Sequence, residues 1–107
     1  DIGSVVIKDR KELSEEGVVV VSVAIDFANR KLLNNPDVIS RGFVNINESM
    51  ELFAECKAII KTAVLDALKE ENTGVYHMRQ CIVESLGEFL ENEIGRKPVI
   101  LPTILEV

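Results

Sequence analysis

Few side chains in this sequence are of the types that usually do chemistry. His77 is the single histidine among 107 residues, so a histidine-rich metal site or a nucleophile–histidine–carboxylate triad would depend on one side chain. We interpret His77 as a polar residue at the start of a helix. The six glycines are scattered and form no glycine-rich phosphate-binding loop. The sequence therefore predicts no catalytic, metal or cofactor site in this chain.

The two cysteines, Cys56 and Cys81, both fall in helical patterns. A domain of this size that relied on disulfides would normally contain more of them. We therefore predict reduced thiols that pack in a core, as is typical of a cytoplasmic protein. The alternative is a regulatory or metal-binding thiol pair, which is disfavoured because we expect no histidine at ligand spacing from either thiol.

Acidic side chains outnumber basic ones, and the formal net charge is −6. Phosphate backbones attract an excess of Lys and Arg, so RNA contact is expected from a local basic patch at most. Carboxylates that do acid–base work need a cleft that shifts their pKa values, and no such cleft is predicted. We interpret the carboxylates as a solvated face. The most prominent are Glu12, Glu15, Glu16, Glu88, Glu91 and Glu93.

Arg41 is the most informative charged residue, because it lies in an extended segment with apolar neighbours. Its guanidinium could pair with an internal carboxylate, hold a partner chain or meet an RNA phosphate, and we favour these three roles in that order. Arg96 and Lys97 form a small basic spot after the second predicted helix. We interpret that spot first as a complement to the helix dipole and second as an RNA contact.

The bulk composition indicates one globular domain. Hydrophobic residues make up 47% and charged residues 28% of the chain, and the length is sufficient for a single core. The longest apolar run, residues 18–21, is too short to span a membrane, and no secretory signal is visible. The chain begins at Asp1 rather than at a methionine, so we expect it to be a piece of a longer polypeptide or a processed product.

Residues 18–26 carry the strongest strand signal, because they are rich in β-branched side chains. Both faces are largely apolar, which predicts a central strand. We expect a partner, or the missing part of a parent chain, to cover the face that carries Val18 and Val20. One face of the strand consists of Val19, Val21, Val23 and Ile25, and the other of Val18, Val20, Ser22 and Ala24.

Shorter extended segments flank this strand. Residues 27–30 are expected to form a hairpin connection, with a return strand from Lys31 and a further extended segment over residues 38–46. Residues 5–7 are a candidate first strand. The tail, residues 99–107, is extended again, and its Pro102 indicates an edge position or a bulge.

Two amphipathic helices separate these strands. Asn47 is the candidate N-cap of the first helix, and Leu65 lies on the side of that helix opposite its apolar stripe, either simply exposed or in contact with another chain. The second helix is predicted over residues 76–94, with Gly95 as its stop. The stripe of the first helix comprises Leu52, Phe53, Cys56, Ile59, Ile60, Ala63, Val64 and Ala67, and that of the second Met78, Ile82, Leu86, Phe89 and Leu90.

The order of elements is therefore β-β-α-α-β. Two amphipathic helices need a surface to cover, and a sheet of about three strands supplies it. We predict an α+β fold, a two-layer sandwich with both helices packed on one face of the sheet.

Several segments, taken in order, resemble the C-terminal domain of bacterial ribonuclease J. They are DIG at residues 1–3, VIKDR at 6–10, LSEEG at 13–17, SRGFV at 40–44 and RKPVILPTILEV at 96–107. The resemblance runs from end to end. It implies that residues 1–16 lead in from a catalytic region and that residues 17–107 form the domain.

The resemblance also implies a function. The parent would be a ribonuclease of metallo-β-lactamase fold with an inserted β-CASP domain, using two zinc ions in RNA processing and decay as a 5′-to-3′ exonuclease and endonuclease. This chain would be its non-catalytic accessory domain, supporting oligomerisation and activity. Expected partners are the catalytic domain, a second identical or paralogous subunit and, through the parent, RNA, with no membrane involved.

Two other functions compete with that interpretation. An auxiliary RNA-contacting module of the same enzyme would use Arg41, Arg96 and Lys97. An independent small enzyme is the weakest hypothesis, because no catalytic constellation is present. The half-covered strand bearing Val18 and Val20, together with Leu65, favours the accessory domain instead.

Overall fold

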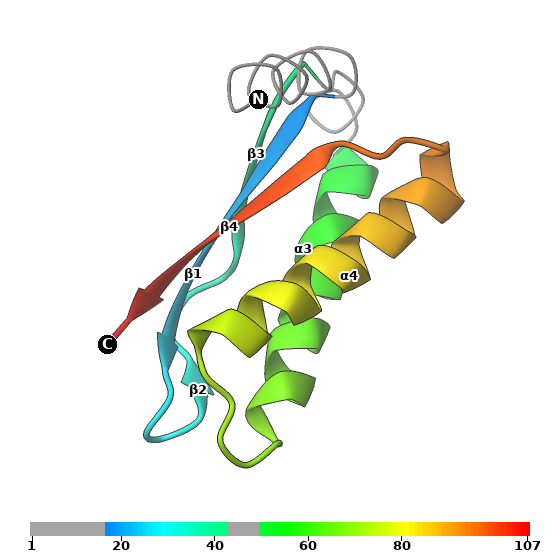
Figure 1. Ribbon diagram of the computed structural model, residues 1–107. Coiled ribbons are helices and arrows are strands. Elements are labelled where there is room, and N and C mark those ends of the chain that lie inside the picture. The colour runs from blue at the N-terminus through cyan, green and yellow to red at the C-terminus, as the bar shows by residue number, and fades with distance from the viewer. Residues whose placement is uncertain (1–16, 43–49) are drawn as a thin grey trace, which may run out of the picture.

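The computed structural model describes residues 17–42 and 50–107. The candidate first strand at residues 5–7, the Asn47 cap and residues 43–46 of the predicted extended segment lie outside the described residues. Within the described parts, the elements follow the order β-β-β-α-α-β, an α+β arrangement as predicted (Figure 1).

The sheet is built around β1, which spans Val18–Asp26 as predicted. One edge of β1 pairs with β4 in parallel, over Val18 to Ile25. The antiparallel partners β2 and β3 pair with Ile25–Asp26 and with Val18–Ser22 respectively, so they must share the other edge. Three strand positions result, which agrees with the predicted sheet. The remaining strands are β2, Lys31–Leu32; β3, Asp37–Arg41; and β4, Val99–Glu106.

The parallel pairing of β4 with β1 follows from the antiparallel helices α3 and α4. They return the chain to the end of the sheet where β3 stops, so β4 runs opposite to β3 and in the direction of β1. The backbone N–H of Val99 donates to the carbonyl of Gly17, and that of Val107 donates to Ile25. Odd-numbered residues of β4 therefore donate toward β1, and the nitrogen of Pro102 faces the outer edge, where no donor is needed. Of the two predicted explanations for Pro102, the edge position is the correct one.

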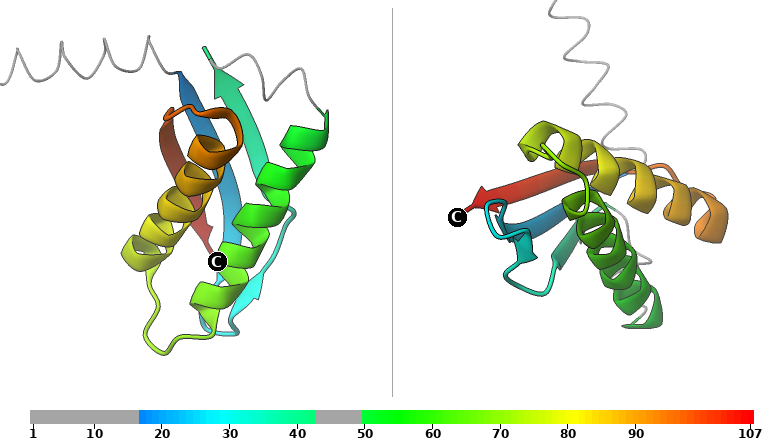
Figure 2. Two further views of the ribbon diagram at one scale, coloured as in Figure 1. Left: turned by 90° about the vertical axis from the view of Figure 1, so that its right-hand side faces the viewer. Right: turned by 90° about the horizontal axis from the view of Figure 1, so that it is seen from below.

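Both helices cover the same face of the sheet (Figure 2). Helix α3 spans Met50–Leu68, and α4 returns antiparallel to it over Val75–Ile94, starting one residue before the predicted Tyr76. Gly95 ends α4 with φ of 66° and its N–H bonded to the carbonyl of Glu91, so it is the left-handed cap that the sequence indicated.

The hydrophobic core lies between these two layers. The predicted inner face of β1 is buried, as are Met78, Ile82, Leu86 and Leu90 of α4. In the predicted stripe of α3, Phe53 and Ile59 are only partly buried, whereas Leu68, which the prediction omitted, is buried. The core residues of α3 are Leu52, Cys56, Ile60, Ala63, Val64, Ala67 and Leu68.

The first testable prediction concerns two glycines. Gly17 has φ of +82°, and a Cβ added there would lie 2.8 Å from the carbonyl oxygens of Arg41 and Gly42. A Cβ on Gly87, inside α4, would meet only Ile100, at 3.5 Å. We expect Gly17→Ala to lower the free energy of unfolding by more than about 1 kcal/mol.

Gly87→Ala serves as the matched control and should leave stability unchanged or raise it by up to about 1 kcal/mol. Urea denaturation followed by circular dichroism measures both. Equal effects of the two substitutions would contradict the close backbone approach at the start of β1.

The second prediction concerns Cys56, which is fully buried in the core. Burial, with a smaller contribution from the charge of Glu55, raises the pKa of its thiol from 9.0 to about 11. Because the folded state holds this proton more tightly, the associated stability is present below pH 9.0 and is lost as the pH rises toward about 11.

Cys56→Ala should flatten this part of the dependence of the unfolding free energy on pH, although it also lowers stability by removing a buried side chain. Cys81→Ala should leave the part of this pH dependence that comes from the Cys56 thiol unchanged. Denaturant titrations across the alkaline range measure the slope. A slope that Cys56→Ala leaves unchanged would rule this titration out.

Candidate functional site

Within the described residues, no helix covers the face of the sheet turned away from α3 and α4 (Figure 2). This face is largely apolar, with Ser22, Asp37 and Thr103 as a polar row across its middle. The register places Val20 between Ile39 of β3 and Leu101 of β4, and Ala24 beside Leu105. Ile39 is 54% exposed, Leu101 48% and Leu105 63%. Patches of this kind mark interaction surfaces in soluble proteins. We call this surface, which comprises Val18, Val20, Ala24, Ile39, Val99, Leu101 and Leu105, the open sheet face.

The prediction that Val18 and Val20 lie on a face not covered by the helices is consistent with the structure, in which both are only partly buried. Ile39 was not predicted as a neighbour of Val20. Leu101 and Leu105 were predicted to share one face of the tail, but the sequence did not assign that face to the same surface as Val20. The alternating pattern of β4 indicated which of its residues share a face. The sequence carried no signal for the register of β4 against β1, which decides the neighbours of that face.

Charged groups stand at the two ends of this face. Arg41 is exposed at the end of β3, next to Val18 in the register. No carboxylate within residues 17–42 and 50–107 forms an ion pair with it, so the favoured internal pairing is not seen there. At the other end, hydrogen bonds from the Asn29 side chain and backbone lower the pKa of Asp26, which keeps that carboxylate charged.

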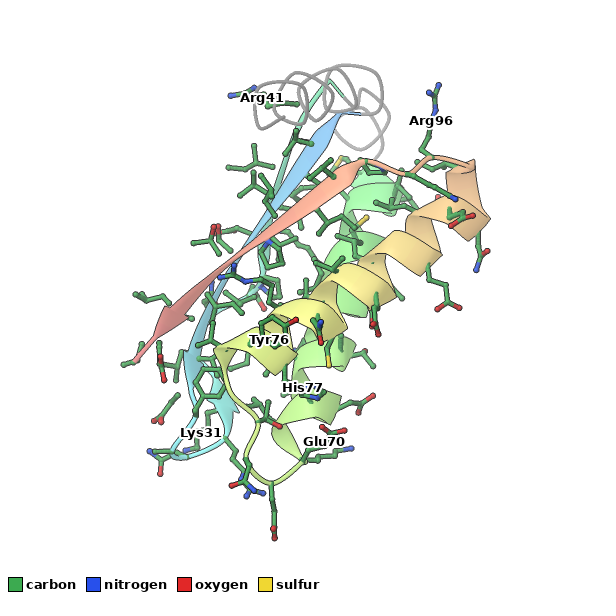
Figure 3. All side chains as sticks on the ribbon, in the orientation of Figure 1. Lys31, Arg41, Glu70, Tyr76, His77 and Arg96 are labelled. Carbon is green, nitrogen blue, oxygen red and sulfur yellow. The ribbon has the colours of Figure 1, made fainter. Side chains whose placement is uncertain are left out.

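The predicted basic spot is divided in the structure. Lys97 Nζ lies 3.5 Å from Glu91 Oε1, near the end of α4. Arg96 is exposed in the connection to β4. Arg96 and Arg41 lie at the same end of the molecule but on separate elements (Figure 3).

His77 lies close to Cys81, so the expectation that no histidine stands at ligand spacing from a cysteine was wrong. Its Nε2 lies 3.5 Å from Cys81 Sγ and 2.7 Å from Glu70 Oε2. The spacing of four residues on a helix was the signal that we overlooked. Burial, with the charges of Glu70 and Glu84, raises the pKa of the Cys81 thiol, which disfavours the reactive thiolate. In the described part of the chain, no three acidic, His or Cys side chains are placed to hold a metal ion.

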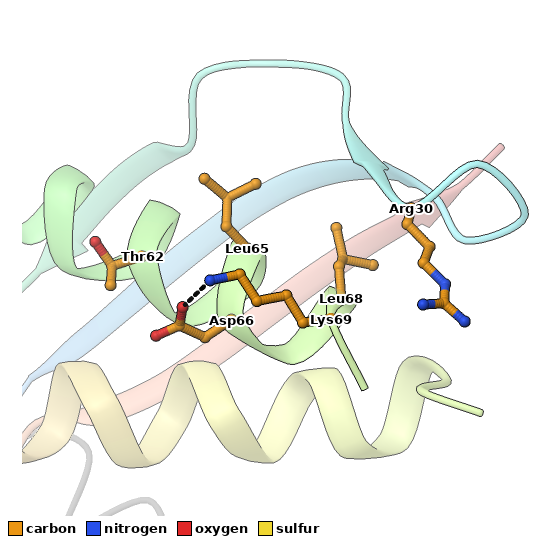
Figure 4. Close-up of a pocket in the computed structure, with 6 residues that line it drawn as sticks. All are labelled: Arg30, Thr62, Leu65, Asp66, Leu68 and Lys69. Carbon is orange, nitrogen blue, oxygen red and sulfur yellow. Dashed lines mark ion pairs between the residues drawn. The ribbon is translucent and has the colours of Figure 1, made fainter. Parts of the chain in front are cut away.

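Leu65 borders a second surface. It is 41% exposed on α3, in agreement with its predicted position off the apolar stripe. With Arg30, Thr62, Asp66, Leu68 and Lys69 it lines a hollow of about 650 Å³ (Figure 4). Within the described residues, neither α3 nor α4 is apolar over a length that would cross a membrane.

Comparison with known proteins identifies the family. The model of the family described as Ribonuclease J C-terminal domain matches residues 5–107. Ribonuclease J 1 of Streptococcus pyogenes serotype M3 is 37% identical over 105 residues, which cover 98% of this chain and 19% of the relative. Ribonuclease J2 of Bacillus subtilis is 34% identical over 107 residues, covering 100% of this chain and 19% of the relative.

Ribonuclease J 2 of Staphylococcus aureus is 31% identical over the same length, again with 19% of the relative covered. The chain thus spans about a fifth of the length of the relatives it matches. The family match and the full-length identities agree with the segments quoted from the sequence and with the α+β sandwich. The chain belongs to the ribonuclease J C-terminal domain family.

Proposed function

We propose that this chain is a non-catalytic accessory domain of a ribonuclease J and that its open sheet face binds a second ribonuclease J subunit, identical or paralogous. Through this contact it supports oligomerisation and activity of the nuclease. The reaction itself, hydrolysis of RNA with zinc ions, is assigned to the part of the polypeptide outside this chain. The presence of only one histidine in 107 residues supports that assignment.

The observation that carries the proposal is the apolar character of the open sheet face. The two helices bury the other face of β1, whereas Ile39, Leu101 and Leu105 remain about half exposed or more. Removing apolar surface from water contributes roughly 25 cal/mol per Å². A second sheet that packs on this face would bury these side chains as the inner face of a sandwich.

A second copy suits this face because the face carries both a cation and carboxylates. Arg41 stands at one end of β1, Asp37 lies opposite Ser22 nearer the middle, and Asp26 stands at the other end beside Lys31. A two-fold axis that sets the two β1 strands antiparallel brings the Arg41 end of one copy toward the Asp26 end of its partner. Such an isologous contact uses the same patch twice and needs no other surface.

The third prediction tests this contact in the complete ribonuclease J polypeptide. Leu101→Lys and Leu105→Lys place a charge on the open sheet face, where burial against a partner would be costly. We expect both to lower the molar mass measured by size exclusion with light scattering, and to reduce the rate of RNA hydrolysis. Folding should be preserved, because both side chains are exposed in this chain.

Leu65→Lys makes the same chemical change at an exposed leucine of α3 and should leave the mass unchanged. An unaltered mass in both sheet variants would contradict the proposal. Reduced hydrolysis without a change of mass would instead place the catalytic region of the same polypeptide on this face.

The alternative function is direct RNA contact, favoured by the presence of two exposed guanidinium groups, Arg41 and Arg96, at one end of the domain. The fourth prediction separates it from the accessory function. Because the net charge is −6, we expect the 107-residue chain alone not to bind single-stranded RNA even at low salt. Fluorescence anisotropy with a labelled oligoadenylate measures this. Binding that falls steeply with salt and disappears in Arg41→Ala and Arg96→Ala would favour the alternative.

A further inference from the structure

A groove runs between α3 and the short strand β2 on the side of the sheet that the helices cover. One hollow of about 650 Å³ lies between Arg30, in the β1–β2 turn, and the last turns of α3. A second, of about 310 Å³, shares Leu65 with the first and reaches the segment after β2. We call the two together the α3–β2 groove. Its lining comprises Arg30, Leu32, Leu33, Asn34, Asn35, Lys61, Thr62, Leu65, Asp66, Leu68 and Lys69.

The groove offers apolar anchoring sites to a partner. Leu65 is 41% exposed and Leu33 is 49% exposed, and the two line the same hollow from opposite elements. Leu68 is almost fully buried and lines the adjoining hollow. Leucines in this position, accessible but set in a hollow, can bury one or two apolar side chains of a ligand.

The rim of the groove is positively charged on an otherwise acidic chain. Arg30, Lys61 and Lys69 are exposed around it. Among the described residues that line the groove, Asp66 is the one carboxylate, and its Oδ1 lies 3.5 Å from Lys69 Nζ (Figure 4). Cations in excess of carboxylates complement an acidic ligand and speed its association.

The backbone of Arg30 is a second, independent observation. Its φ is +54°, a left-handed conformation that glycine adopts without strain and arginine does not. Non-glycine residues held in such conformations are found at active sites and ligand clamps. Arg30 is exposed and lines the first hollow (Figure 4).

The lining distinguishes a peptide from a nucleic acid. Single-stranded RNA is usually held by bases stacked on aromatic rings beside phosphate-binding cations. None of the described residues that line the α3–β2 groove is aromatic. Leucines flanked by cations instead suit a peptide ligand in which carboxylates flank an apolar side chain.

We propose that the α3–β2 groove is a docking site for a short acidic segment of a partner protein that carries an apolar anchor such as leucine or phenylalanine. The anchor lies between Leu33 and Leu65, and the acidic residues face Arg30, Lys61 and Lys69. This site is separate from the open sheet face, and the proposal does not depend on the accessory function.

The fifth prediction is tested by selection from a random peptide display library on the 107-residue chain. We expect the enriched peptides to combine an apolar anchor with neighbouring Asp or Glu, and to bind the chain when synthesised with a fluorescent label. Leu65→Asp should weaken that binding at least about tenfold, because it removes an anchor contact and adds a like charge. Leu105→Asp, the same change on the open sheet face, should leave binding unchanged.

Arg30→Gly separates a functional from a structural role. It should keep or raise the thermal midpoint, since glycine relieves the positive φ, while weakening peptide binding several-fold. Circular dichroism confirms that each variant is folded.

Three results would overturn the proposal. The first is the absence of enriched acidic peptides, or enriched peptides whose binding is insensitive to Leu65→Asp and Arg30→Gly. The second is competition for the groove by a single-stranded RNA. The third is self-association of the chain that Leu65→Asp abolishes, which would assign the groove to a second copy.

Discussion

The burial of one face of β1 beneath α3 and α4 is the constraint on which the rest of this structure depends. Val19, Val21, Val23 and Ile25 are at most 1% exposed, and they meet the inward stripes of both helices. Because side chains alternate along a strand, burying this set leaves Val18, Val20, Ser22 and Ala24 on the other side. In residues 17–42 and 50–107, α3 and α4 supply the second layer, and both lie on one face of the sheet.

The connection through α3 and α4 also decides where β4 lies. The two antiparallel helices return the chain to the end of the sheet where β3 stops, so β4 runs parallel to β1 and takes the edge that β2 and β3 leave free. Pro102 is tolerated there because its nitrogen faces outward. The same pairing brings Leu101 and Leu105 onto the side of Val20, and the predicted tail strand thereby becomes part of the open sheet face. In the part of the chain that the structure describes, the domain thus presents a largely apolar surface that α3 and α4 do not cover.

This arrangement of strands and helices fixes the positions of the polar side chains. In the described residues, these side chains do not come together in a reaction centre. Glu70, His77 and Cys81 form an exposed hydrogen-bonded cluster that links the α3–α4 connection to α4. Arg41 and Asp26 lie at opposite ends of the open sheet face, and Arg30, Lys61 and Lys69 surround the α3–β2 groove. The two surfaces differ in character. The open sheet face is largely apolar, whereas the α3–β2 groove has leucines in its lining and cations on its rim. The two surfaces therefore suit different partners.

The sequence by itself determined the local elements. Alternation and β-branching identified Val18–Asp26, a stripe at helical spacing identified α3 and α4, and Gly95 marked the end of α4, since each signal lies within a few neighbouring residues. Short segments of the sequence also indicated the family, and the comparisons confirmed it. Only the tertiary structure decided that Ile39, Val20 and Leu101 share a surface and that Arg30, Leu33 and Leu65 enclose a groove. These sets join residues far apart in the chain, and their contact depends on strand register and helix packing, for which local periodicity carries no information.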